Sequence, residues 1–288
     1  MSTSTATKTD WMAARDLRFK PVENPRPKTL TRAQVEAYNR DGYLKAFPIF
    51  DAAGAERNRA YFDSLLAQLK TFNDGRDTYS INGYHTHCAG LHDLVMNPRI
   101  LDLVEDIVGP DIICWGTHFF CKIPHDPKSV PWHQDASYWP FSPARTVTVW
   151  LAIDDASVEN ACMRFIPGTH RMGHLSWKRT QSEAVLDQEI EGIDALGAPV
   201  PIELKAGEIE LHADMLAHGS PPNPSARRRC GLTLRYCPPS VRSLNPDWRG
   251  QGVLCRGRDA EQYWKHWPRP AGEDLTLPQN RKVAIGAN

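Results

Sequence analysis

Residues 130–135 read Val-Pro-Trp-His-Gln-Asp, and this stretch carries the clearest structural signal in the sequence. In an extended strand, side chains two positions apart project from the same face. His133 and Asp135 can therefore bind one metal ion together. Such a pair and one distant histidine make the two-histidine, one-carboxylate set that leaves three positions of an octahedral iron open. A His-x-Asp pair is common by chance, so the surrounding sequence has to decide its meaning.

A second pair with the same spacing is His212-Ala213-Asp214. If that pair bound the metal, the histidine left downstream would be His266, and no arginine stands about ten residues beyond it. For His133 and Asp135, His218 lies downstream at the end of an apolar strand, and a basic strand start follows it. The arrangement with His218 is therefore the one that we predict.

The segments on both sides of this stretch have the composition of β-strands. After Pro110 the sequence consists of β-branched and aromatic runs that are interrupted by Pro, Gly and Asn. No helical pattern separates successive strands, which favours an antiparallel sandwich or barrel over a parallel βαβ sheet. The predicted strands span residues 111–123, 146–153, 163–166, 200–204, 208–212 and 229–237.

Residues 31–110 are predicted to be mainly helical. Thr31 and Gln34 form a capping box, which is typical of a helix start. Asn97 can cap a helix whose first residue is Pro98, a position that proline favours. The predicted helices cover 32–40, 55–72 and 98 to the stop at 109, with one short helix around 259–267.

The 288 residues show no convincing linker and no internal repeat, so one domain is expected. Its predicted fold is mainly β with flanking helices. The parts of this single domain are an extended leader over 1–30, the mainly helical part over 31–110, the β core over 111–237 and a C-terminal extension over 238–288.

Composition excludes several classes of partner. Lys+Arg and Asp+Glu both number 34, so no basic field is available for nucleic acid. The apolar runs fall short of the roughly 20 residues that span a bilayer, and residues 1–10 lack the apolar stretch of a secretory signal. The seven cysteines contain no Cys-x-x-Cys pair, which argues against a disulfide framework or zinc knuckle. We therefore expect a cytoplasmic protein with neither a nucleic-acid nor a membrane partner; its oligomeric state is not indicated.

Five blocks of the sequence together resemble the phytanoyl-CoA dioxygenase family, whose members are non-haem iron(II)- and 2-oxoglutarate-dependent oxygenases built on a double-stranded β-helix. The blocks occur in the family's order over roughly residues 30–240. They are Asp41–Leu44, Val130–Asp135, Trp150–Asp155, Ile166–His170 and Ala217–Ser220, with Asn223 and Arg229 following. The resemblance implies a jelly-roll-like, double-stranded β-helix core and a single catalytic domain.

The resemblance also implies roles for particular residues. His133, Asp135 and His218 would bind Fe(II), and the arginine eleven residues after His218 would hold the far carboxylate of 2-oxoglutarate, which makes it Arg229. Strand alternation places Arg227 on the same face as Arg229, so Arg227 is the alternative, and Arg228 on the opposite face. Two further residues would line the carboxylate pocket, Ser220 and Trp150, although Trp150 fits an ordinary core aromatic equally well.

The remaining histidines and aromatics are less informative. In the family, the regions of His118, Tyr138 and Trp139 face substrate. By default His85, His87 and His92 are exposed loop residues, and His212 can line the cavity without binding metal. The groups expected at the mouth are polar and aromatic, whereas a long-chain acyl-CoA would need an apolar tunnel and a basic patch. We therefore expect a small polar substrate, including zwitterionic or anionic ones.

The predicted reaction is the hydroxylation of a small molecule with Fe(II), 2-oxoglutarate and O2, releasing succinate and CO2. Alternatives are a desaturating oxygenase and a halogenase of the same family, and the carboxylate of Asp135 argues against the halogenase. A zinc hydrolase could use three ligands and a water, but it has no use for the arginine. A non-enzymatic β-sandwich that binds a metal or sugar would leave the spacing of His218, Ser220 and Arg229 as coincidence.

Overall fold

The structure, a computed structural model, describes residues 12–245, 248 and 252–276. The first eleven residues, which belong to the predicted leader, lie outside these ranges. The helices are α2 (Arg32–Asp41), α3 (Ala52–Thr71), α4 (Ala89–Val95) and α5 (Pro98–Val108). The strands are β1 (Tyr43–Pro48), β2 (Ile112–Lys122), β3 (Val130–His133), β4 (Phe141–Ser142), β5 (Val147–Ala152), β6 (Met163–Phe165), β7 (Trp177–Arg179), β8 (Gln188–Ile190), β9 (Val200–Ile202), β10 (Glu208–Ala213), β11 (His218–Ser220), β12 (Arg229–Cys237), β13 (Arg242–Ser243) and β14 (Val253–Arg256).

Local capping explains where the predicted helices begin. The Thr31 side chain accepts a hydrogen bond from the backbone N–H of Gln34, and the Gln34 side chain accepts one from Thr31, so the capping box of α2 is confirmed. Asn97 accepts from the first turn of α5, directly before Pro98. Helix α4 was not predicted, because it has seven residues and its N-cap, Cys88, makes no side-chain cap.

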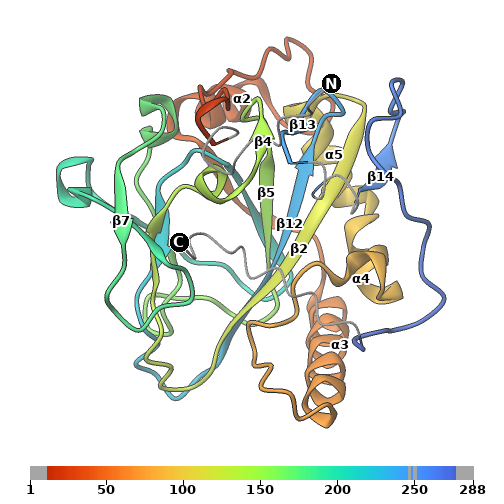
Figure 1. Cartoon of the computed structure of the whole chain (residues 1–288), viewed down its shortest axis with the longest axis vertical. Helices are drawn as coiled ribbons and strands as arrows, with labels where there is room; N and C mark the ends of the chain where they lie inside the picture. Colours follow the sequence, from red (N-terminus) through yellow and green to blue (C-terminus); the bar gives the residue numbers. More distant parts are fainter. Residues whose placement is uncertain (1–11, 246–247, 249–251, 277–288) are drawn as a thin grey trace, which may run out of the picture.

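The largest sheet has six strands in the order β1-β10-β5-β12-β2-β14, and every neighbouring pair is antiparallel. One face of this sheet packs against the helices and forms the main hydrophobic core, with Phe62 of α3 and Val104 of α5 fully buried against Leu232 and Leu234 of β12. Helices α3, α4 and α5 lie together on one side of β2 and β12 (Figure 1). The helical layer therefore covers only one face of the sheet.

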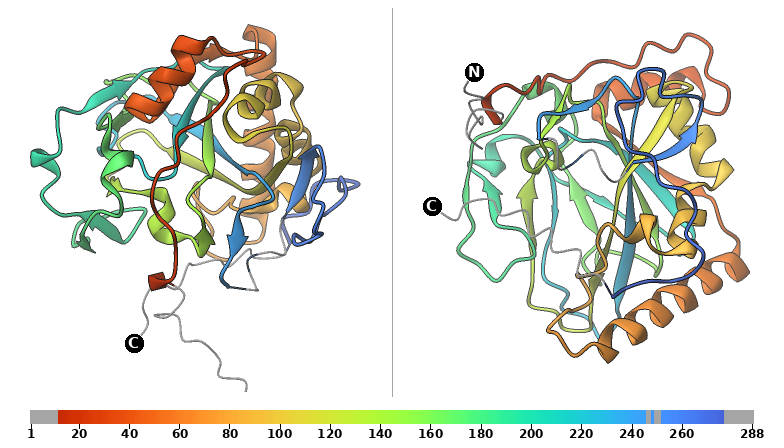
Figure 2. Two further views of the ribbon diagram at one scale, coloured as in Figure 1. Left: turned by 90° about the horizontal axis from the view of Figure 1, so that it is seen from above. Right: turned by 45° about the vertical axis from the view of Figure 1, so that its right-hand side comes forward.

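A second sheet, in the order β3-β11-β6-β9, lies over the other face. Two further views show helices α3 to α5 on one side of the large sheet and the segment with β7 and β8 on the other (Figure 2). Because both faces of the large sheet are covered, all nine residues of β12 are buried. Alternate residues of that strand therefore face either the helical core or the space between the sheets.

Two expectations from sequence are wrong. Residues 259–267 form turns and a bridge instead of a short helix, because the buried Asp259 carboxylate accepts from the backbone N–H of Trp264 and fixes a turn. His85 and His92 are buried and His87 is half-buried, so none of the three is exposed, since η1 (Tyr84–Thr86) and α4 are packed into the fold. Loop composition around these histidines gave no sign of that packing.

Candidate metal and cosubstrate site

Three side chains from two strands and the turn after one of them meet between the sheets. His133 ends β3, Asp135 follows it at the start of η2 (Asp135–Tyr138), and His218 begins β11. Strands β3 and β11 pair so that His133 and His218 stand opposite each other. One ligand atom from each of the three buried residues lies within 4.8 Å of the others, and within the described residues no other such group of His, Cys, Asp and Glu occurs.

Backbone carbonyls orient both imidazoles. Nδ1 of His133 lies 2.8 Å from the carbonyl oxygen of Pro131, and Nδ1 of His218 lies 2.9 Å from that of Leu216. An Nδ1–H that donates to a carbonyl leaves Nε2 with a free lone pair. Burial and the nearby His133 hold the pKa of His218 well below its usual value, so this imidazole is neutral at physiological pH. Both rings are thus prepared to ligate through Nε2.

The Asp135 carboxylate is held from both sides. Its Oδ2 accepts a 2.9 Å hydrogen bond from Thr148 Oγ1 and lies 3.6 Å from Nε2 of His212, while Oδ1 lies 3.6 Å from Nε2 of His133. Burial alone would raise the pKa of this carboxyl, but His133 and His212 hold it well below its usual value. Asp135 is therefore an anion, and its Oδ1 points toward the histidine ligand atoms.

The second His-x-Asp pair has other partners. His212 Nδ1 lies 2.8 Å from Oε1 of Glu210, and the Asp214 carboxylate accepts from the backbone N–H of Thr146 at 2.9 Å. Burial lowers the pKa of His212, but the charge of Glu210 and then Asp135 raises it to about 9. His212 consequently lies beside the cluster as a cation, and Asp214 is not one of the three clustered groups.

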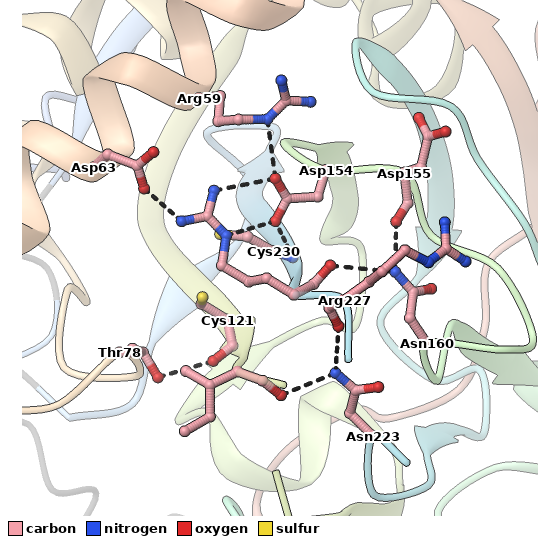
Figure 3. Close-up of polar contacts among 12 residues, drawn as sticks. Arg59, Asp63, Thr78, Cys121, Asp154, Asp155, Asn160, Asn223, Arg227 and Cys230 are labelled. Atoms are coloured by element: carbon pink, nitrogen blue, oxygen red, sulfur yellow. Dashed lines mark hydrogen bonds and ion pairs between the residues drawn. The ribbon is translucent and has the colours of Figure 1, made fainter. Parts of the chain in front are cut away.

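The three consecutive arginines have three different environments. Only Arg229 lines the cavity: it is 1% exposed, its Nε and Nη2 donate to the Ala161 carbonyl at 3.0 and 2.7 Å, and its guanidinium lies 5.5 Å from the centre of the Trp150 ring. Arg228 points the other way and donates to the carboxylates of Asp154 and Asp63. Arg59 donates to the same Asp154 carboxylate (Figure 3).

Arg227 is the alternative that strand alternation left open. It lies before the first residue of β12, where the strand pattern does not apply, and it pairs with Glu159 at 2.6 Å near the surface. The Asn223 amide donates to the carbonyl of Arg227 (Figure 3). The Asn160 amide donates to the carbonyl of Arg228. These bonds set the entry into β12, so Arg229 is the arginine of the three that faces the cavity.

Ser220 and Trp150 also line this cavity. The Ser220 hydroxyl is buried and has no hydrogen-bond partner among the described residues, so it is free to donate to a ligand. The Trp150 ring, 2% exposed, packs beneath Arg229. The full lining consists of Phe120, Val130, His133, Asp135, Trp150, Met163, His212, His218, Gly219, Ser220, Arg229, Thr233 and Arg235.

The three predicted substrate residues do not belong to that lining, but each packs against one of its residues. His118 packs on Phe120, and its Nε2 is 2.7 Å from the Tyr79 carbonyl. Tyr138 packs edge-on to His133, and Trp139 lies against the guanidinium of Arg235. Contact of His118, Tyr138 and Trp139 with substrate stays a prediction.

Arg235 was not singled out by the sequence reasoning, although a signal for it existed. Strand alternation counted from Arg229 places positions 231, 233 and 235 on the same face, and Thr233 and Arg235 do line the cavity. Thr148, which holds Asp135, was missed too, because nothing local marks it as the partner of a residue in the turn after β3.

These features define a class of protein: two facing antiparallel sheets that enclose a buried His-x-Asp…His group and an arginine. A family model described as "Phytanoyl-CoA dioxygenase (PhyH)" matches residues 38–231, and the chain belongs to this family. The family is one of iron(II)- and 2-oxoglutarate-dependent dioxygenases, as the sequence motifs predicted.

Comparisons with individual proteins agree with this family assignment. The chain is 27% identical over 192 residues to a "Probable phytanoyl-CoA dioxygenase" of Caenorhabditis elegans (63% of this chain, 62% of that protein) and 30% identical over 146 residues to "Phytanoyl-CoA dioxygenase, peroxisomal" of Bos taurus (48% and 43%). It thus spans about three fifths and two fifths of these relatives. The solved structure of the apo form of ThoJ, a non-haem monooxygenase, matches with a TM-score of 0.70 at 27% identity, covering 83% of this chain and 88% of that one. This likeness confirms the predicted double-stranded β-helix.

None of the described helices is long and apolar enough to cross a membrane.

Proposed function

We propose that this protein uses Fe(II), 2-oxoglutarate and O2 to hydroxylate a small polar molecule, with release of succinate and CO2. One observation carries the proposal. The clustered His133, Asp135 and His218 share a buried cavity with Arg229 and Ser220. A metal-ligand set and a carboxylate-binding set in one buried space are what this chemistry requires.

The donor set fits Fe(II). His133 and His218 would contribute neutral imidazoles and Asp135 a carboxylate, and three ligands leave room for cosubstrate and oxygen. When bound, the iron supplies the oxidative decarboxylation of 2-oxoglutarate by O2 and the insertion of one oxygen atom into a C–H bond. The other oxygen atom ends in succinate.

The remaining cavity residues would place the cosubstrate. The Arg229 guanidinium matches the fork of a carboxylate, and its anchoring to the Ala161 carbonyl and Trp150 ring fixes its position before the ligand arrives. The unpartnered Ser220 hydroxyl can donate to the same carboxylate. Such anchoring favours reaction because the oxidisable bond must be correctly placed.

The same residues weigh against the alternatives. A carboxylate at position 135 occupies the place that chloride would need in a halogenase. The buried Arg229 has no role in a zinc hydrolase, and a purely structural metal site would not require an arginine-lined cavity. The polar groups Thr233 and Arg235 in the lining support a small polar substrate over a long acyl chain.

The metal and cosubstrate can be tested by absorption spectroscopy under anaerobic conditions. Wild-type protein with Fe(II) and 2-oxoglutarate should show a weak visible charge-transfer band that His133→Ala and His218→Ala abolish. His125→Ala, an exposed histidine outside the cavity, is the matched control and should keep the band. Tight zinc binding without any effect of 2-oxoglutarate would contradict the proposal.

The substrate class needs a separate test. Succinate release and product mass should be measured with a panel of small polar compounds and with a fatty acyl-CoA. We expect a product heavier by one oxygen atom from a small polar compound. Efficient, coupled turnover of the acyl-CoA would show that the substrate class is wrong while leaving the reaction type standing.

A further inference from the structure

A second arginine faces the same cavity at the other end of β12. Arg235 is 8% exposed and lines the cavity together with Arg229 and the three clustered metal-binding groups. Six positions along a strand separate the two Cα atoms by about 20 Å at about 3.3 Å per residue. The two guanidinium groups therefore enter the cavity from different ends.

Aromatic rings, not acids, hold Arg235 in place. Its guanidinium carbon lies 5.7 Å from the centre of the Trp115 ring and 5.2 Å from that of Trp139, and these two rings pack edge to face at 4.5 Å. Two rings at these distances stabilise a cation and restrict its rotation. The side chain is thus pre-positioned before any ligand arrives.

Among the described residues, no hydrogen-bonding or acidic partner holds the Arg235 guanidinium. Its buried Nε has no hydrogen-bond partner, and no carboxylate lies within ion-pair distance of its side chain among the described residues. By contrast, Arg228 binds two carboxylates and Arg229 a carbonyl. Asp135 shares the cavity and its charge acts on Arg235, but it does not form an ion pair with it. A buried cation without an anion in contact is costly, so its position at the cavity favours an anionic ligand.

Arg235 lies at the other end of β12 from the residues that would hold the far carboxylate of 2-oxoglutarate. The carboxylate of 2-oxoglutarate that lies far from the metal needs one guanidinium, and Arg229 is anchored for that purpose near Ser220. The nearest acid in the cavity, Asp135, already has Thr148, His133 and His212 around it. Arg235 therefore remains available to a third molecule in the cavity.

We propose that Arg235 binds a carboxylate, phosphonate or phosphate group of the substrate, so that the molecule that this protein oxidises is a small anion. Trp139 acts as a positioning residue that holds the guanidinium. The proposal rests on the proposed function for the reaction, but the binding of the anion can be measured without turnover.

The test is a titration of the anaerobic protein, loaded with Fe(II) and 2-oxoglutarate, with small carboxylates and phosphonates and with their uncharged amides. Binding is followed by calorimetry and by the shift of the visible band. We expect anions of the panel to bind at least tenfold more tightly than the matching amides. Arg235→Met should lose about 10- to 150-fold in anion affinity and keep its 2-oxoglutarate affinity.

Matched variants separate this role from a structural one. Arg235→Lys keeps the charge without the fork and should retain part of the anion affinity, which also covers the case in which Arg235→Met does not fold. Arg242→Met is the control, since that arginine also lies over an aromatic ring, Tyr263, but outside the cavity. It should bind like wild type.

The outcomes are distinguishable. Equal binding of amides and anions, no binding of any anion, or unchanged anion affinity in Arg235→Met would overturn the inference. A loss of 2-oxoglutarate affinity in Arg235→Met would assign the residue to the cosubstrate instead. Anion binding without succinate release from any compound would support the inference and contradict the proposed function. Turnover of neutral compounds only would support the proposed reaction and contradict the inference.

Discussion

Asp135 and Asp214 are both buried carboxylates two positions after a buried histidine, yet their surroundings differ. Asp135 faces His133 and His218, whereas Asp214 accepts from the backbone of Thr146. Asp135→Ala should therefore abolish Fe(II) binding, and Asp214→Ala should leave about one iron per chain. Metal analysis of folded, reconstituted variants measures this. Equal loss of iron in both would mean that the wrong pair was chosen.

The Asp214 carboxyl should also make stability depend on pH. Burial raises its pKa to about 7, so the folded protein keeps a proton that the unfolded chain, with a pKa near 3.8, gives up. The contribution of Asp214 to the free energy of unfolding is fully present below about pH 4 and is lost as the pH rises through 7. Asp214→Asn, which cannot ionise, should therefore gain up to roughly 4 kcal/mol over wild type between pH 4 and pH 8.

The comparison is made on metal-free protein by urea unfolding at several pH values. The difference between the two proteins isolates Asp214 from Glu210 and His212, which titrate in both. A difference that stays constant from pH 4 to pH 8 would show that Asp214 is not protonated in the folded protein.

Arg229 offers a direct test of cosubstrate binding. A charge-assisted contact with a carboxylate contributes about 1.5–3 kcal/mol, so Arg229→Ala should weaken 2-oxoglutarate binding about 10- to 150-fold. Arg227→Ala should change it little, because that side chain pairs with Glu159 outside the cavity. Calorimetry with the Fe(II)-loaded protein measures the 2-oxoglutarate affinity of both variants. A defect in Arg227→Ala and none in Arg229→Ala would show that the strand entry is wrongly placed.

Strands β5 and β12 are joined by an unusually close contact behind the cosubstrate pocket. Gly231 of β12 faces Trp150 of β5, and a Cβ at position 231 would lie 1.9 Å from a ring carbon. Only glycine leaves room for the ring at its place beneath Arg229. The absence of a side chain at Gly231 in β12 thus makes room for the Trp150 ring of β5.

Gly231→Ala should displace the Trp150 ring. We expect a loss of about 1–3 kcal/mol in the free energy of unfolding, typical of overpacking, together with weaker 2-oxoglutarate binding. Gly116→Ala on β2 is the matched control, because the nearest atom to its added Cβ would be at 3.7 Å. If both variants unfold at the same urea concentration and bind the cosubstrate equally, the ring position does not depend on Gly231.

At the scale of the whole molecule, Asp154 connects the helical layer with the large sheet. It accepts from Arg59 of α3, from Arg228, and from the backbone N–H of Cys230 in β12 (Figure 3). The ligand-bearing face of β12 therefore depends on a contact made on the strand's opposite side. Asp63 of α3 meets Arg228 at the same strand entry.

Asp154→Ala should cost about 1–3 kcal/mol of unfolding free energy, since it leaves the buried N–H of Cys230 without a partner. Glu159→Ala removes an exposed ion pair with Arg227 and should cost about 1 kcal/mol or less. Urea unfolding of both variants measures which substitution costs more unfolding free energy. Equal stability of the two would mean that the contact between the layers adds nothing.

Local sequence determined the parts of this protein that depend on few neighbouring residues. The capping box at Thr31, the Asn97 cap and the six predicted strands involve hydrogen bonds and side-chain alternation within a few positions, so they could be predicted. The same alternation placed His133 and Asp135 together. Family motifs supplied the match of His218 and Arg229 to them.

Only the tertiary structure decided which distant groups meet. The strand pairing between β3 and β11 sets His133 opposite His218, Thr148 reaches Asp135 from the other sheet, and Trp115 and Trp139 close on Arg235 from separate segments. The burial of His85 and the turn at Asp259 were decided in the same way. Such contacts join residues far apart in the chain, and their geometry follows from strand register and packing, which no local pattern encodes.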